Sequence, residues 1–292
     1  MKVGFHALPV HKIQAQVIEE IASVFSVKGF QIWFSSTLMK PVEKSLTLPF
    51  SYSVFSMEDD ISSFSLLLSL GGDGTILDSL LYAVPHHVPL LGVNFGRMGF
   101  LPNIISSKLT EVAAILQEGQ AEIIERSLLE IELSEENPFR SHNFALNEVS
   151  ITKKDTASMI TIQTYLNGEF LNEFWGDGLI VSTPTGSTGY SLSCGGPILW
   201  PQSKGLVLTP VSPHNLSMRP IVLPHDVGLR LLPKGRQHKI MISMDSRSRS
   251  VTINQAISIK TSAKVALFLN VPGSSFSQIL REKLFWGKDL RN

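Results

Sequence analysis

The residues best suited to chemistry in this chain surround one aspartate, in the stretch SLLLSLGGDGTILDSLLYAV from Ser65 to Val84. An apolar run ends at two glycines, and apolar residues with helical spacing follow. A strand, a glycine turn and a helix together bind anions, because glycine exposes backbone N–H groups and the helix N-terminus adds partial positive charge. The neighbouring glycines suit that role, whereas the carboxylate of Asp73 would repel a phosphate. A divalent cation, or a hydroxyl that gives up its proton, would remove this conflict.

The stretch alone leaves two interpretations of Asp73 open. It lacks the G-x-x-x-x-G-K-[ST] spacing that supplies a lysine to a triphosphate, and it lacks the G-x-G-x-x-G dinucleotide fingerprint. Asp73 could therefore act on a ligand. It could equally form an Asx-turn or cap the helix, since aspartate is common in both places.

A second glycine-rich stretch favours a ligand. The sequence WGDGLIVSTPTGSTGYSLSCGGPILW, from Trp175 to Trp200, mixes serine and threonine hydroxyls with glycines. Small hydroxyls and accessible backbone suit hydrogen bonds to the edges of a sugar, a base or a phosphate. The alternative, a tight Gly/Ser/Thr-rich hairpin region, explains the length and density of the stretch less well.

Composition limits the classes of partner. Of the 292 residues, 43% are hydrophobic and 17% charged, below the roughly 25% of ordinary soluble proteins, so a sizeable core can form. The net charge of zero predicts no nucleic-acid or membrane partner. The single cysteine, Cys194, excludes an internal disulfide framework, and no apolar run approaches the roughly 18 residues of a membrane span. We therefore expect a cytoplasmic protein. No zinc spacing and no G-x-S-x-G motif occur.

The first 125 residues alternate strand-like and helix-like segments, which predicts a Rossmann-like α/β domain with a parallel sheet. The expected strands are residues 1–5, 30–36, 65–70 and 88–93. The expected helices are residues 13–27, 76–84 and 110–118.

After about Arg126 the segments become short and strand-like, which predicts an all-β sandwich over 126–270. The expected strands include residues 128–135, 144–154, 159–166, 168–174, 238–245, 250–255, 256–262 and 264–270. Asn167-Gly168 between two of them predicts a hairpin, because both turn residues need positive φ. Residues 271–292 form a tail with a helix over 275–286, which we expect to pack back on the first domain.

Three motifs, in this order, resemble the NAD kinase family: GGDGT at 71–75, LNEVSI at 146–151 and GDGLIVSTPTGSTGYSLSCGGPI at 176–198. The first also occurs in lipid kinases and phosphofructokinases, whereas the third is long and specific. The resemblance implies an enzyme that transfers the γ-phosphoryl group of ATP to the 2′-hydroxyl of the adenosine ribose of NAD, giving NADP. It also implies a divalent cation, usually Mg²⁺, and a homodimer or homotetramer.

The resemblance assigns roles to residues of this chain. Asp73 matches the general base, with Gly74 beside it in the nucleotide site. Asn147 and Glu148 match a pair that suits an adenine edge and ribose hydroxyls, although such a pair on a strand is otherwise more often solvated or turn-capping. Asp177 matches a residue that reaches the nicotinamide half across a subunit boundary. The residues that match the family's wall around the adenine are Thr185, Thr188, Gly189, Tyr190, Ser191, Leu192 and Ser193.

Some residues depart from the family pattern. Arg97 and Met98 differ from the commonest family wording, while Gly96, Gly99 and Phe100 fit. Arg247 stands where many relatives carry glutamine, which leaves its contact with a nucleotide open. Two rival functions also stay open: a kinase with a lipid or sugar acceptor, and a sensor that holds NAD or NADP without catalysis.

Overall fold

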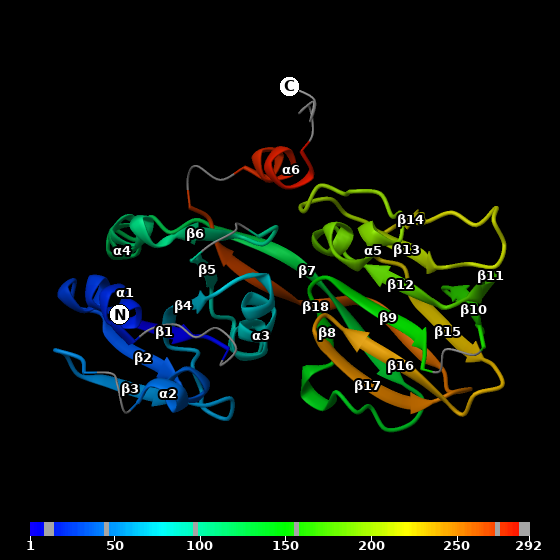
Figure 1. Cartoon of the computed structure of the whole chain (residues 1–292), viewed down its shortest axis with the longest axis horizontal. Coiled ribbons are helices and arrows are strands. Elements are labelled where there is room, and N and C mark those ends of the chain that lie inside the picture. Colours follow the sequence, from blue (N-terminus) through cyan, green and yellow to red (C-terminus); the bar gives the residue numbers. More distant parts are fainter. Residues whose placement is uncertain (9–14, 44–46, 96–98, 155–157, 272–274, 286–292) are drawn as a thin grey trace. The chain divides into compact units, whose positions relative to one another are not determined.

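The computed structural model of this chain describes residues 1–8, 15–43, 47–95, 99–154, 158–271 and 275–285 (Figure 1). The chain divides into two compact units. Unit 1 comprises Met1–Glu125 and Ala266–Asn292, and unit 2 comprises Arg126–Val265. None of the helices in the described ranges has both the length and the apolar character needed to cross a membrane.

Unit 1 contains a parallel sheet. Its strands are β1 (Lys2–His6), β2 (Gln31–Ser35), β3 (Tyr52–Phe55), β4 (Phe64–Leu70), β5 (Leu90–Asn94), β6 (Asn103–Ile105) and the end of β18 (Ile257–Leu269). The strand order is β18-β5-β4-β1-β2-β3, and β6 pairs with β5. This confirms the predicted α/β domain with a parallel sheet.

Helices and short 3₁₀ turns connect these strands. They are α1 (Ala15–Val27), α2 (Ser36–Val42), α3 (Asp73–Ala83), η1 (Val84–His86), η2 (Ser106–Lys108), α4 (Leu109–Gln117) and α6 (Phe276–Leu284). The three helices expected in the first domain are confirmed as α1, α3 and α4, apart from residues 13 and 14, which lie outside the described ranges. The sequence did not predict α2, which begins where the Ser35 hydroxyl accepts the N–H of Leu38.

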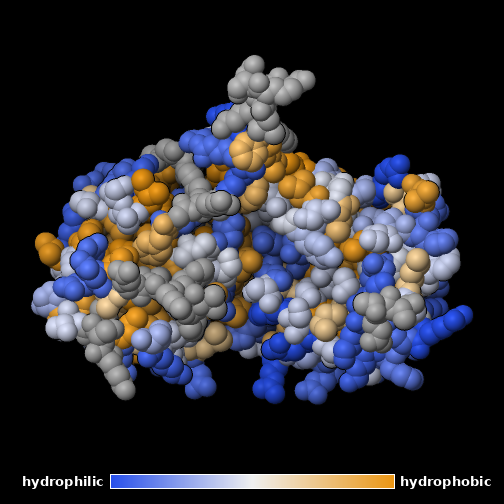
Figure 2. Space-filling view, in the orientation of Figure 1, coloured by the Kyte–Doolittle hydropathy of each residue, from blue (hydrophilic) through white to orange (hydrophobic). Residues whose placement is uncertain are grey.

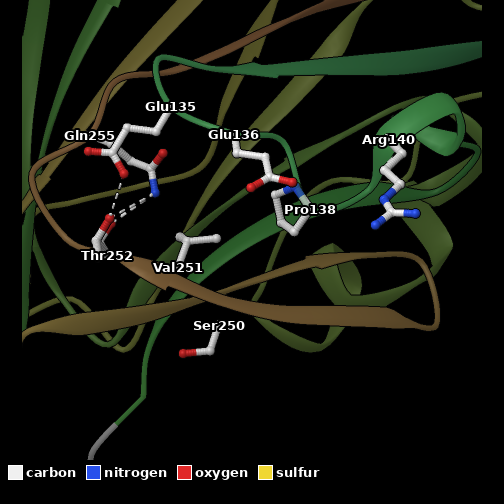
Figure 3. Close-up of a pocket in the computed structure, with 8 residues that line it drawn as sticks. All are labelled: Glu135, Glu136, Pro138, Arg140, Ser250, Val251, Thr252 and Gln255. Carbon is white, nitrogen blue, oxygen red and sulfur yellow. Dashed lines mark hydrogen bonds between the residues drawn. The ribbon is translucent and has the colours of Figure 1, made fainter.

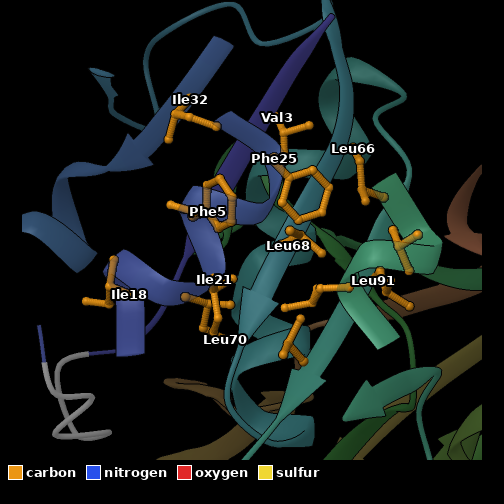
Figure 4. Close-up of a cluster of buried hydrophobic side chains, with 14 of the residues drawn as sticks. Val3, Phe5, Ile18, Ile21, Phe25, Ile32, Leu66, Leu68, Leu70 and Leu91 are labelled. Atoms are coloured by element: carbon orange, nitrogen blue, oxygen red, sulfur yellow. The ribbon is translucent and has the colours of Figure 1, made fainter. Parts of the chain in front are cut away.

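The core of unit 1 forms between the sheet and its helices (Figure 4). Helix α1 buries Ile18, Ile21, Ala22 and Phe25. This spacing of three and four residues places the side chains on one face of a helix. Figure 4 shows Ile18, Ile21 and Phe25 against side chains of β1, β2, β4 and β5. After the helix, Gly29 adopts a φ of 80°, a left-handed conformation that glycine adopts without strain.

Unit 2 consists of two antiparallel sheets that share one core. The first contains β7 (Ile123–Leu133), β8 (Phe144–Ala145), β10 (Ile160–Leu166), β11 (Glu169–Gly176), β15 (Leu229–Lys234) and β18. The second has the order β14-β13-β12-β9-β16-β17. Its strands are β9 (Glu148–Lys153), β12 (Gly178–Ser182), β13 (Leu206–Val211), β14 (Ile221–Leu223), β16 (Lys239–Met244) and β17 (Arg247–Thr252). The β-rich second half is thereby confirmed.

Two details of unit 2 test the predicted strands. Asn167 and Gly168 have φ values of 49° and 90° and join β10 to β11, which confirms the predicted hairpin. The two strands expected at 256–262 and 264–270 are wrong, because one continuous strand, β18, covers both. The apolar pattern breaks at the exposed residues Ala263 and Lys264, but the extended backbone continues through them. A hydropathy pattern indicates which residues of a strand are buried, but it does not show where the strand ends.

Candidate functional site

Asp73 is the first residue of α3, directly after β4 and two glycines. Gly71 has a φ of 152° and donates its N–H to the carbonyl of Val93 at 2.9 Å. The carbonyl of Gly72 accepts the N–H of Thr75 at 2.9 Å and so begins the helix. The turn therefore sets the Asp73 side chain at the positive end of α3.

The Asp73 carboxylate is held by the backbone of the segment after β5. Its Oδ2 accepts the N–H of Phe100 at 2.8 Å, and its Oδ1 accepts the N–H of Leu101 at 3.4 Å. A Cβ added at Gly99 would lie 1.7 Å from Asp73 Oδ1, so only glycine fits at this close approach. Asp73 thus bonds a neighbouring loop through its side chain instead of merely closing its own turn.

Burial disfavours the negative charge of Asp73, and nearby donors and a lysine partly compensate. Burial raises the pKa of its carboxyl above the usual value, against the backbone N–H groups of Phe100 and Leu101 and the positive charge of Lys283 on α6. A carboxylate with a raised pKa is a stronger proton acceptor while it stays ionised.

Among the described residues, no group of three His, Cys, Asp or Glu side chains could hold a metal ion. Protein side chains alone therefore do not form a complete site for the predicted divalent cation in these ranges. Mg²⁺ in phosphoryl transfer is commonly held by one or two carboxylates together with the phosphates of the substrate. Asp73, a half-buried carboxylate at a helix N-terminus, fits that donor set.

In unit 2, the fold brings two of the sequence motifs together. Asn147 lies between β8 and β9, and Glu148 begins β9, where it pairs with Ser182 at the end of β12. The chain then enters η4 (Thr185–Thr188) and α5 (Tyr190–Ser193). A Cβ at Gly186 would lie 2.0 Å from the carbonyl oxygen of Asn147, and one at Gly189 would lie 2.7 Å from Glu148 Oε2. The glycines of this motif therefore permit direct contact with the Asn-Glu pair.

Several polar atoms in this part of unit 2 have no partner among the described residues. They are Asn147 Oδ1, Glu148 Oε2 and Thr185 Oγ1, all buried. An unpaired buried polar group costs free energy that a polar ligand can offset. Burial, together with the negative charge of Asp245, raises the pKa of Glu148 to about 7, against a hydrogen bond from the Tyr190 N–H. Glu148 therefore exchanges its proton near neutral pH.

The other predicted site residues differ in their surroundings. Asp177 forms an ion pair with Lys153, with 2.7 Å between Oδ1 and Nζ. Tyr190 is 41% exposed, Leu192 is half-buried and Ser193 is exposed. Ser191 is fully buried, and its hydroxyl bonds the Thr209 hydroxyl at 2.8 Å. The structure therefore leaves Tyr190 free to stack on a base, whereas the Ser191 hydroxyl is already engaged within unit 2.

The Thr188 hydroxyl donates to the carbonyl of Thr185 at 3.2 Å. Gly74 is exposed, with nothing within 4 Å of where a Cβ would be. Arg97 and Met98, which depart from the family pattern, and Gly96, which fits it, lie outside the described ranges. The roles of these site residues stay predictions.

A pocket of about 330 Å³ lies elsewhere in unit 2 (Figure 3). It is lined by Glu135, Glu136, Pro138, Arg140, Ser250, Val251, Thr252 and Gln255. None of these is a predicted site residue. The surface over β16 and β17 is largely hydrophilic on the face drawn in Figure 2, as expected from the exposed Ser248, Arg249, Ser250 and Thr252. We therefore place the candidate site by its residues and not by this pocket.

Three structural features of the candidate site were missed from the sequence. Gly99 fits the family pattern, but the sequence does not indicate its contact with Asp73. Asp245 bonds the backbone next to Asn147, and Lys283 of α6 acts on Asp73. Arg247 donates to the carbonyls of His142 and Phe144, so the structure gives it a role within unit 2. The sequence signal for this turn is Asp245-Ser246 between two strand-like segments, and that signal does not reveal the contacts of Asp245.

Comparison with family models matches both parts of the chain. Residues 3–121 match the ATP-NAD kinase N-terminal domain, and residues 146–271 match the ATP-NAD kinase C-terminal domain. The NAD kinase of Flavobacterium johnsoniae is 40% identical over 294 residues, which cover 100% of both chains.

Two solved structures have a similar fold. One is yeast NADH kinase complexed with NADH, with a TM-score of 0.85 and 22% identity, covering 100% of this chain and 89% of the yeast chain. The other is an NAD kinase from Archaeoglobus fulgidus in complex with ATP, with a TM-score of 0.71 and 22% identity, covering 98% and 99% of the two chains. At this identity the likeness shows the shared fold.

Proposed function

The chain belongs to the NAD kinase family and is an enzyme of that class, and from this premise we propose its reaction and its base. It transfers the γ-phosphoryl group of ATP to the 2′-hydroxyl of the adenosine ribose of NAD, giving NADP and ADP. Asp73 is the general base.

The observation that carries this proposal is the environment of Asp73. Its carboxylate is fixed by the N–H groups of Phe100 and Leu101, and burial raises its pKa. A general base must be positioned within hydrogen-bond reach of the proton that it takes, and it works best when its pKa approaches the operating pH. A carboxylate that only capped its own helix would need neither the loop contact nor the glycine at position 99.

In the proposed step, Asp73 accepts the proton of the 2′-hydroxyl while the ribose oxygen bonds to the γ-phosphorus. The bond from that phosphorus to the β–γ bridging oxygen breaks, and ADP leaves. The N–H groups of Phe100 and Leu101 keep the carboxylate in place during this transfer. A divalent cation, when bound by the phosphates of ATP beside Asp73, would supply neutralisation of the phosphate charge.

The remaining site residues are proposed to bind NAD. Asn147 and Glu148 take the adenine edge and the ribose hydroxyls, and Asp177 serves the nicotinamide half in a homodimer or homotetramer. The wall of the adenine site consists of Thr185, Thr188, Gly189, Tyr190, Ser191, Leu192 and Ser193. Gly74 keeps the turn open beside the base. The reaction is placed in the cytoplasm.

An assay of the purified protein with ATP, Mg²⁺ and NAD tests the proposal. NADP should form, and Asp73→Asn should reduce kcat by about 10²–10⁴-fold while NAD binding, measured by calorimetry, is retained. Glu111→Gln, an exposed carboxylate on α4, is the control and should leave kcat unchanged. Supplying NADH in place of NAD tests the acceptor.

Three results would argue against the proposal. Full activity of Asp73→Asn would remove the proposed base. NAD binding without any product in the unmodified protein would favour the sensor. Phosphorylation of a lipid or sugar in the absence of NAD binding would favour the rival kinase.

A further inference from the structure

The turn between β16 and β17 contacts the segment that carries the Asn-Glu pair. β16 and β17 pair up to Met244 and Arg247, and Asp245 takes a left-handed φ of 51° at the turn. β16 also pairs with β9, with Met244 opposite Val149. The turn therefore lies beside the residues that precede β9.

The carboxylate of Asp245 accepts hydrogen bonds from a run of backbone N–H groups. Oδ2 accepts the N–H of Leu146 at 2.9 Å, and Oδ1 accepts that of Asn147 at 2.7 Å and that of Glu148 at 3.4 Å. The N–H of Asp245 itself donates to the carbonyl of Glu148 at 3.1 Å. Both oxygens accept, so the ionised carboxylate is the form that fits. Hydrogen bonds to a charged group are the stronger kind.

Arg247 bonds the same segment as a hydrogen-bond donor, whereas Asp245 bonds it as an acceptor. Its guanidinium donates to the carbonyls of His142 and Phe144 and lies 5.7 Å from the centre of the Phe144 ring. Burial raises the pKa of the Asp245 carboxyl above its usual value, and the N–H groups that donate to it and the positive charge of Arg247 act against that rise. One turn thus offers an acceptor for the N–H groups of residues 146–148 and a donor for the carbonyls just before them.

A second contact holds the other side of this segment. The Thr183 hydroxyl donates to the carbonyl of Leu146 at 2.6 Å, and the Thr183 N–H donates to the carbonyl of Asn147 at 2.9 Å. The backbone around Asn147 is therefore bonded on both sides. The directions of the Asn147 and Glu148 side chains follow from this backbone.

We propose that Asp245 is a positioning residue for NAD: its carboxylate fixes the backbone of residues 146–148 so that Asn147 and Glu148 present their side chains to the nucleotide, and Arg247 supports it. The inference rests on the proposed function, since it assumes that this pair binds NAD. The role proposed for Asp245 and Arg247 runs through the backbone that they bond.

Asp245 should also act on Glu148 through its charge, which a purely structural role would not require. The negative charge of Asp245 is one cause of the raised pKa of Glu148. The other groups that act on Glu148 are its own burial and the N–H of Tyr190, and Arg247 acts through Asp245. Replacing Asp245 by a neutral residue should therefore lower the pKa of Glu148.

The test is Asp245→Asn in the full-length protein. One amide oxygen can still accept, but the amide nitrogen then faces a backbone N–H. We expect the KM and Kd for NAD to rise about 10- to 100-fold, the loss that corresponds to hydrogen bonds with a charged group. We expect kcat to stay within about threefold, because the lost interaction contributes equally to binding of the ground state and of the transition state.

The pH profile is the second readout. A plot of kcat/KM for NAD against pH reports ionisations of the free enzyme. The unmodified protein should show an inflection near the pKa of Glu148, about 7, and Asp245→Asn should move it to lower pH. Asp226→Asn, an exposed aspartate of unit 2, is the control and should change neither the inflection nor KM.

Arg247→Gln keeps one neutral donor and should raise KM for NAD less than Asp245→Asn, so it tests the turn if Asp245→Asn fails to fold. An unchanged Kd for NAD, an unmoved inflection, or a fall in activity that only tracks the folded fraction would overturn the proposal. Amide hydrogen exchange separates it from the proposed function. Faster exchange at Leu146, Asn147 and Glu148 in Asp245→Asn would confirm the backbone contact even if the unmodified protein made no NADP.

Discussion

Asp73 and Glu148 are two carboxylates whose ionised forms are disfavoured by different surroundings. At Asp73, burial raises the pKa, while N–H groups and Lys283 resist that rise. At Glu148, burial and the like charge of Asp245 act together, and one N–H resists. Burial disfavours a charged group, a like charge adds to that effect, and hydrogen bonds to the charged form reduce it. Each residue is therefore in an environment where gaining a proton is easier than in water.

The raised pKa of Glu148 predicts a pH-dependent stability. The unfolded value is 4.5 and the folded value about 7, so between these limits the folded state binds more protons and stability falls as pH rises. This difference corresponds to roughly 3 kcal/mol of unfolding free energy. Glu148→Gln cannot lose a proton, so its stability relative to the unmodified protein should increase from pH 5 to pH 8 by up to about 3 kcal/mol. Urea unfolding at both pH values measures it.

The control for this measurement is Glu169→Gln, an exposed glutamate at the start of β11. Its relative stability should be the same at pH 5 and pH 8. A Glu148→Gln difference that is equally flat would mean that Glu148 titrates in the folded protein as it does in the unfolded chain.

At the residue scale, the sequence could indicate Asp73 and the Asn-Glu pair because each lies in a short contiguous motif. It could not indicate their supporting contacts. Asp245 bonds N–H groups that are 97 to 99 positions away, and the N–H of Phe100 that holds Asp73 is 27 positions away. Spacing within a motif predicts local conformation, but it does not determine which distant backbone groups a side chain meets.

At the scale of elements, the parallel sheet of unit 1 explains why a loop meets Asp73. β4 and β5 are neighbours in register, with Leu70 opposite Val93. The carboxyl ends of parallel strands share one edge of a sheet, and ligands bind outside that edge. The turn after β4 and the segment after β5 therefore lie together, and Gly99 allows them to touch.

Gly99→Ala tests this contact between elements. The added Cβ would overlap Asp73 Oδ1, so the carboxylate or the loop must move. We expect kcat to fall by at least about 10-fold, since a displaced base is less effective, and the unfolding free energy to fall by about 1–3 kcal/mol. Steady-state kinetics and urea unfolding measure the two effects.

Gly74→Ala is the matched control for stability. Nothing lies within 4 Å of its added Cβ, and alanine is favoured over glycine in a helix by roughly 1 kcal/mol. It should be neutral or stabilising. A Gly99→Ala protein as stable as Gly74→Ala, with normal kcat, would show that the loop does not hold Asp73.

Element type was predictable where a local signal was strong. The Asn-Gly pair gave the β10–β11 hairpin, and helical spacing gave α1. Helix α2 was missed although Ser35 caps it, because Pro41 within it argues against a helix. β3 was missed because it is an edge strand with exposed residues, so its burial gives no alternating pattern.

At the scale of the whole molecule, the chain leaves unit 1 and returns to it. Unit 2 ends at Val265, and Ala266 is again part of unit 1. Leu269 and Val271 belong to the core of unit 1, and Phe268 pairs with Leu90 on β5. The sequence predicts a return only from residue 271, because an apolar strand such as residues 264–270 fits either unit equally well.

Leu269→Ala tests whether the returning strand completes the core of unit 1. Leu269 is 1% exposed and packs in that core, so its truncation leaves a cavity and should cost about 2–5 kcal/mol of unfolding free energy. Leu267→Ala, the same change at a half-buried position of the same strand, is the matched control and should cost less. Urea unfolding of the two variants and the unmodified protein measures both losses. Equal losses in the two variants would mean that the returning strand only covers unit 1. A larger loss for Leu269→Ala would mean that the core of unit 1 depends on a segment that follows all of unit 2 in the sequence.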